Sequence, residues 1–79
     1  MDESLEPKVI AILLKITKTD TLQSRKDLLD LGILDSLSIV ELVTRIEKEF
    51  GVRLAADDFT HQNFNSVDAI CQLITAKRS

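Results

Sequence analysis

Hydrophobic residues recur at helical spacing in three separate stretches of the chain. In the first stretch, Val9, Leu13 and Ile16 lie three or four positions apart, which places them on one face of a helix. Pro7 suits the first helical position, because the N–H group that proline lacks has no partner there. The pattern predicts a helix over Pro7–Thr17, with an apolar face wide enough to pack against two or more other helices.

The most regular pattern lies in the middle of the chain. Asp35 stands where its side-chain oxygen can cap a helix, and Gly51 stands where a left-handed residue can end one. We therefore expect a helix over Ser36–Phe50. Its hydrophobic residues follow the spacing i, i+3, i+4, i+7 and i+11: Ile39, Leu42, Val43, Ile46 and Phe50.

A third periodic stretch closes the chain. Val67, Ile70 and Ile74 again share one helical face. Ser66 is a suitable N-cap for this helix, which is expected to end near Ala76.

Two segments lack clear periodicity. Thr19–Leu34 is interrupted by polar residues but rich in leucine, which predicts a long ordered loop with a helical turn near Arg25–Leu29. Val52–Asn65 is expected to be a loop with one or two helical turns, which form a short third helix. The three aromatic residues are predicted to be wedges in the core: Phe50, Phe59 and Phe64.

These elements predict an all-α fold, a small antiparallel helical bundle of three main helices plus one short helix, built as one domain over residues 1–79. At 79 residues with 44% hydrophobic content, such a core contributes roughly 3–5 kcal/mol, which leaves little room for buried catalytic groups. The single cysteine, Cys71, is expected to pack in the core, and the single histidine, His61, to lie on the surface. We predict neither a metal site nor an enzyme.

Charge and hydropathy exclude further classes of protein. Ten Lys and Arg residues against thirteen Asp and Glu residues give a net charge of −3, which is unfavourable for binding nucleic acid. The longest apolar stretch, Val9–Leu14, is far shorter than the ~20 residues of a membrane span. Acidic residues precede it, unlike the basic start of a signal peptide. We expect a cytoplasmic monomer without a membrane span.

One loop delivers a serine to the start of the central helix. The run Asp35-Ser36-Leu37, followed by Ile39–Val43 and ending in Glu47–Gly51, resembles the acyl and peptidyl carrier proteins, and the resemblance covers nearly the whole chain. It implies the acyl-carrier-protein-like bundle and a 4′-phosphopantetheine group on Ser36, with Asp35 and Leu37 completing the motif. It also implies that Asp35 lies beside the magnesium ion of a partner transferase.

The position of Ser36 favours the same interpretation independently. Backbone N–H groups at a helix start lack partners and carry positive charge, which suits a phosphodiester. No base is near in sequence, so Ser36 is a poor nucleophile by itself but a good substrate. The partners that the resemblance implies are a phosphopantetheinyl transferase, acyl- or aminoacyl-activating enzymes and acyl-transferring enzymes, with the cargo held as a thioester.

The exposed face of the central helix is the predicted partner surface. Leu37 and Val40 lie outside the stripe of residues predicted to be buried. The glutamates Glu41 and Glu47 are equally consistent with solvated charges and with contacts to basic partners. An alternative function is a helical adaptor that uses this face to bind a partner helix. The central helix is less acidic than is usual in the carriers of primary fatty acid synthesis. The segment 57–67 is more similar to aminoacyl carriers, including D-alanyl carriers, and to the carriers of specialised pathways. The candidate partner residues are Leu37, Val40, Glu41, Thr44 and Glu47.

Overall fold

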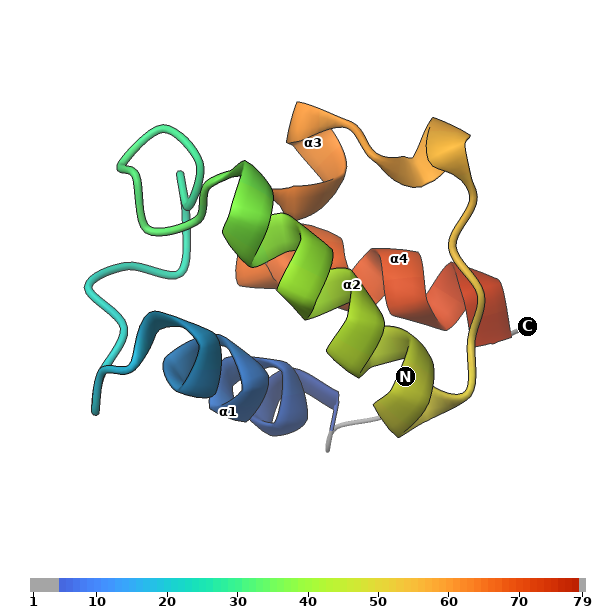
Figure 1. Ribbon diagram of the computed structural model, residues 1–79, viewed down its shortest axis with the longest axis horizontal. Helices are drawn as coiled ribbons and strands as arrows, with labels where there is room; N and C mark the ends of the chain where they lie inside the picture. Colours follow the sequence, from blue (N-terminus) through green and yellow to red (C-terminus); the bar gives the residue numbers. More distant parts are fainter. Residues whose placement is uncertain (1–4, 79) are drawn as a thin grey trace.

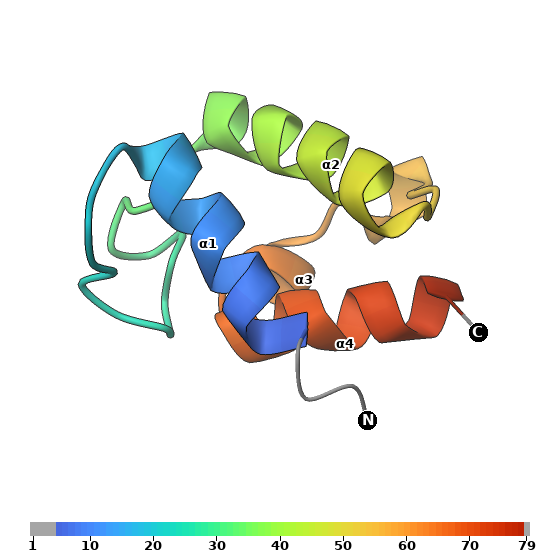
Figure 2. The ribbon, with the colours of Figure 1, turned by 90° about the horizontal axis from the view of Figure 1, so that it is seen from below.

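The computed structural model describes residues 5–78, which form four α-helices and one short 3-10 helix without any strand (Figure 1). This confirms the predicted all-α bundle with three main helices. Helix α1 (Leu5–Thr17) runs opposite to α2 (Ser36–Phe50) and α4 (Val67–Arg78), and these two run in the same general direction (Figures 1 and 2). The elements are α1 (Leu5–Thr17), α2 (Ser36–Phe50), the 3-10 helix η1 (Ala56–Asp58), α3 (His61–Phe64) and α4 (Val67–Arg78).

The ends of α2 lie where the sequence predicts them. Asp35 has an extended backbone, and its side chain accepts a hydrogen bond of 2.8 Å from the Ser38 N–H. Gly51 adopts a left-handed φ of 66°, and its N–H donates to the Glu47 carbonyl at 3.0 Å. A side chain at Gly51 would be strained in this conformation, so glycine is the favoured residue at this helix end.

The other helices extend beyond their predicted bounds. Residue Leu5, which is 2% exposed, begins α1 two positions before Pro7. Pro7 is tolerated inside the first turn because the first four N–H groups of a helix lack partners in any case. Ser66 caps α4 as predicted, accepting from the Ala69 N–H at 3.0 Å, and the helix continues to Arg78.

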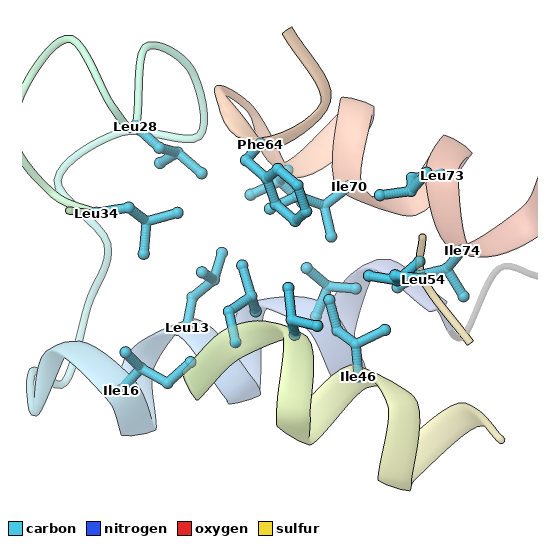
Figure 3. Packing of buried hydrophobic residues seen from close by; sticks show 14 of the residues in the cluster. Leu13, Ile16, Leu28, Leu34, Ile46, Leu54, Phe64, Ile70, Leu73 and Ile74 are labelled. Carbon is cyan, nitrogen blue, oxygen red and sulfur yellow. The ribbon is translucent and has the colours of Figure 1, made fainter. Parts of the chain in front are cut away.

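The core draws side chains from the three main helices, from α3 and from the loop before α2 (Figure 3). Among the aromatic residues, Phe64 is 1% exposed and Phe50 packs partly buried against the cluster. The prediction for Phe59 was wrong, because this side chain is 46% exposed. It stacks on Phe64 with ring centroids 6.0 Å apart, so Phe64 fills the core while Phe59 covers it from outside.

The segment between α1 and α2 is an ordered loop, but the turn predicted near Arg25–Leu29 was misplaced. The turn spans residues 28–32 instead and is closed by a 2.8 Å hydrogen bond from the Leu31 N–H to the Asp27 carbonyl. Leu28 and Leu34 are buried and point toward the centre of the bundle (Figure 3). Leu31 is 58% exposed, so it does not anchor the loop.

No helix formed by residues 5–78 combines the length and the apolar character that crossing a membrane requires.

Candidate functional site

Ser36 is the first residue of α2 and is exposed to solvent. Its hydroxyl makes no hydrogen bond to any residue within the described range, 5–78. The preceding residue, Asp35, is extended and turns the chain into the helix. The hydroxyl therefore lies at the positive end of the helix dipole, where an attached anionic group is stabilised.

Asp35 shapes the electrostatics next to Ser36. Hydrogen bonds from the backbone and the side chain of Ser38 hold the pKa of the Asp35 carboxyl below its usual range, so this group is ionised at neutral pH. One carboxylate oxygen, Oδ1, is engaged in the helix cap. Asp35 thus both fixes the start of α2 and places a negative charge one residue before the serine.

Hydrogen bonds that involve one asparagine, Asn65, fasten the loop before Ser36 to the junction of α3 and α4. The Leu28 N–H donates to the Asn65 carbonyl at 2.8 Å, and the Leu29 N–H donates to Asn65 Oδ1 at 2.9 Å. Asn65 Nδ2 in turn donates to Asp30 Oδ2 at 3.1 Å, and Asp30 Oδ1 lies 2.8 Å from Nε2 of His61. We call this set of contacts the Asn65 clasp.

The Asn65 clasp changes the pKa of one of its members, Asp30. The hydrogen bond with His61 and, after it, the one with Asn65 lower the pKa of the Asp30 carboxyl. His61 lies on the surface as predicted, with 58% of its side chain exposed, and its ring contacts the Asp30 carboxyl. Sequence reasoning did not find this pair, because its members are 31 residues apart and neither belongs to a recognisable motif.

The exposed face of α2 begins directly after Ser36. Leu37 is 82% exposed and Val40 is 62% exposed, so both apolar side chains lie in solvent as the sequence predicts. Leu31, on the loop that leads to Ser36, is exposed as well. The sequence analysis did not select Leu31, because an isolated leucine in a loop carries no periodic signal.

The remaining candidate residues of α2 have partners within the protein. Glu41 accepts from the Arg45 guanidinium at 3.2 Å, and the Thr44 hydroxyl donates to the Val40 carbonyl at 3.0 Å. Glu47 is partly buried, and its Oε2 accepts a 2.9 Å hydrogen bond from the Leu54 N–H. Glu47 therefore fastens the segment that follows α2, a structural contribution that its predicted partner role did not include.

Cys71 lies on the side of α4 that faces the core and is partly buried there. Burial, followed by the charges of Glu6 and Asp68, raises the pKa of its thiol to about 11. The thiol is thus protonated and unreactive at neutral pH. Within residues 5–78, no group of three or more His, Cys, Asp and Glu side chains is arranged to hold a metal ion.

Comparisons with known proteins cover this site. Residues 7–74, which include Ser36, match the protein family described as "Phosphopantetheine attachment site". The chain is 33% identical over 70 residues to the "D-alanyl carrier protein" of Streptococcus pyogenes serotype M1, across 87% of this chain and 89% of that protein. It is also 33% identical over 54 residues to the "D-alanyl carrier protein" of Streptococcus sanguinis (strain SK36), across 68% of each protein.

Proposed function

Because the chain belongs to the family of carrier proteins with a phosphopantetheine attachment site, we propose that Ser36 is the residue that carries the cofactor. Covalently attached 4′-phosphopantetheine is the cofactor that family membership implies. The observation that supports Ser36 is its exposed hydroxyl at the first position of α2, next to an ionised Asp35. Residues 1–79 then act as one carrier domain in the cytoplasm.

The residues around Ser36 suit a phosphodiester better than a catalytic nucleophile. The first turn of α2 supplies backbone N–H groups and a positive dipole end, which stabilise negative charge at Oγ. Asp35 is oriented by its hydrogen bond to Ser38, and its exposed, ionised carboxyl one residue before the serine suits contact with the magnesium ion of a transferase. A partner enzyme therefore activates the hydroxyl, and the chain itself catalyses no reaction.

The attached group supplies a terminal thiol, on which the cargo is held as a thioester. We propose an aminoacyl cargo of the D-alanyl type, because two relatives that align at 33% identity are D-alanyl carrier proteins. The partners are then a phosphopantetheinyl transferase, an enzyme that activates the amino acid and an enzyme that accepts it. Such a carrier serves a specialised pathway instead of primary fatty acid synthesis.

The proposed contact surface for these partners is the exposed face of α2. Leu37 and Val40 provide its apolar part, and Glu41 and Thr44 lie beside them. Glu47 lies at the edge of this surface. Its Oε2 accepts from the Leu54 N–H, so its contribution to partner contacts is through Oε1. A helical adaptor would use the same surface, but it would need no modified serine, so modification of Ser36 separates the two functions.

The attachment is tested by intact mass. The purified unmodified chain is incubated with coenzyme A, Mg²⁺ and a broad-range phosphopantetheinyl transferase. We expect the mass to increase by one phosphopantetheine group in the wild type and in Ser38→Ala, and to stay unchanged in Ser36→Ala. Ser38 is the matched control, because it lies in the same helical turn. Modification of Ser36→Ala, or none of the wild type, would refute the proposal.

The cargo is tested on the modified chain. We expect an ATP-dependent D-alanine-activating enzyme to load it with one D-alanyl group that hydroxylamine releases, as a thioester requires. An acyl–acyl carrier synthetase supplied with a medium-chain fatty acid is the comparison. Efficient loading with the fatty acid and none with D-alanine would contradict the aminoacyl cargo while leaving the attachment site intact.

A further inference from the structure

The helices α1 and α2 pack side by side (Figure 2). Residues of these two helices line a basic cleft. Its volume is about 290 Å³, near the lower limit of roughly 300 Å³ for ligand pockets. Such a volume admits a few side chains of a partner and not a whole folded element. The cleft is lined by Lys8, Ala11, Ile12, Lys15, Arg45, Lys48 and Glu49.

The charge of the cleft is opposite to that of the whole chain. Four cationic side chains and one carboxylate line it, whereas the chain carries a net charge of −3. No carboxylate within residues 5–78 lies at ion-pair distance from Lys8, Lys15 or Lys48. Among the cations of the cleft, and counting partners within residues 5–78 alone, only Arg45 forms an ion pair, with Glu41 at 3.2 Å. The three lysines of the cleft therefore concentrate positive charge that no carboxylate of residues 5–78 pairs with.

We propose that this cleft docks an acidic segment of a partner protein, with carboxylates on both sides of an apolar residue. The carboxylates match the lysines on the two walls of the cleft, and the apolar side chain covers Ala11 and Ile12, of which Ile12 packs partly buried against the core. Complementary charge of this kind steers a partner into a defined orientation and raises its association rate.

A protein segment fits the cleft better than a lipid surface does. The cations line the walls of a concave site between two helices, into which a flat bilayer cannot enter. The large apolar side chains exposed within residues 5–78 are Leu31, Leu37, Val40 and Phe59. Since none of them lines the cleft, the described residues of the cleft offer no exposed large apolar group for insertion between lipids.

The cleft is separate from the attachment site. Arg45 and Lys48 follow Ser36 by nine and twelve residues along α2, which corresponds to roughly 14 and 18 Å of helix rise. A partner held in the cleft leaves the Ser36 hydroxyl and the start of α2 uncovered. The docking therefore does not depend on the modification of Ser36, and its test uses the unmodified chain.

The test is a titration followed by backbone amide NMR shifts. The probe is a capped peptide with two glutamates on each side of a leucine, and a peptide with lysines in place of the glutamates is its control. We expect shifts to concentrate at residues 8–15 and 45–49. In the double variant Lys8→Gln/Lys48→Gln, affinity should fall about fivefold, the loss expected for two exposed ion pairs. The control variant Lys18→Gln/Lys26→Gln removes the same charge outside the cleft and should bind like the wild type.

Four results would overturn the proposal. An equal loss of affinity for the acidic peptide in both double variants would indicate that the charge of the whole surface attracts the peptide. Shifts centred on other residues, or no shifts at millimolar peptide, would exclude the cleft. Binding to phosphatidylglycerol vesicles that depends on Lys8 and Lys48 and exceeds binding to the peptide would assign the cleft to a membrane. Since every measurement uses the unmodified chain, none of these results bears on Ser36.

Discussion

The side-chain oxygen of Asn65 accepts a hydrogen bond of 2.9 Å from the backbone N–H of Leu29, which precedes it by 36 residues. Together with the bond from the Leu28 N–H to the Asn65 carbonyl, it fixes the loop that ends at Ser36. The position of the proposed attachment site thus depends on a residue in the short connection between α3 and α4.

The first prediction concerns this clasp. Asn65→Ala leaves the partly buried Leu29 N–H without its acceptor, which is expected to cost about 1–2 kcal/mol of unfolding free energy. Amide hydrogen exchange at Leu28 and Leu29 should accelerate more than exchange within α2. Gln62→Ala is the control, because Gln62 is exposed and lies on α3, directly before the connection that holds Asn65. Equal exchange rates in the wild type and Asn65→Ala would show that the clasp does not hold the loop.

The second prediction separates the two leucines of the loop turn. Leu28 is fully buried, whereas Leu31 is 58% exposed. Leu28→Ala is expected to lower the unfolding free energy by about 2–5 kcal/mol, because it opens a cavity in the core. Leu31→Ala should change it by less than about 0.5 kcal/mol. Denaturant titration measures both, and similar losses in the two variants would contradict the assigned burial.

The third prediction concerns acid stability. The pKa of Asp35 is lowered in the folded state by its hydrogen bonds to Ser38, so the carboxylate stabilises the fold above its unfolded pKa. That stabilisation is lost as the pH falls through the lowered folded pKa. The pKa values of Asp30 and Asp58 are lowered as well. The melting temperature should therefore be nearly constant around neutral pH and fall below about pH 4.

Asp35→Asn isolates the contribution of this one group. Asparagine is also a good N-cap, so the variant should melt close to the wild type at neutral pH and lose less stability in acid. Asp35→Ala, which removes the cap, should be less stable than the wild type at neutral pH. If the melting temperatures of the wild type and Asp35→Asn fell by the same amount from neutral pH down to pH 3, the assigned pKa shift would be refuted.

The fourth prediction uses the raised pKa of Cys71, about 11 against an ordinary 9.0. At pH 8, the thiolate fraction is then roughly 100-fold lower than that of an ordinary cysteine, so alkylation by iodoacetamide should be slower by about this factor. Urea should restore the ordinary rate. In chain carrying phosphopantetheine, the cofactor thiol should react first. Rapid alkylation of Cys71 in the folded protein, located by peptide mass, would contradict the predicted burial effect.

Local sequence determined the elements of this protein. The spacing of the apolar residues in α2, the side chain of Asp35 at its start and Gly51 at its end all act within a few positions along the chain, so their effects can be predicted from the sequence alone. The same holds for the exposure of Leu37 and Val40, since a helix with one buried face leaves its other residues in solvent. Ser36 was selected in this way as the proposed attachment site, by its motif and by its place before a periodic run.

Tertiary structure decided which residues support these elements. The contacts of Asn65 with Leu29, of Asp30 with His61 and of Glu47 with Leu54 join segments whose separation is set by the packing of whole helices. The exposure of Phe59 in place of burial was decided in the same way, because Phe64 occupies the core position. The cationic cleft exists only because α1 and α2 pack side by side. Periodicity describes one helix at a time, whereas these features depend on how helices meet.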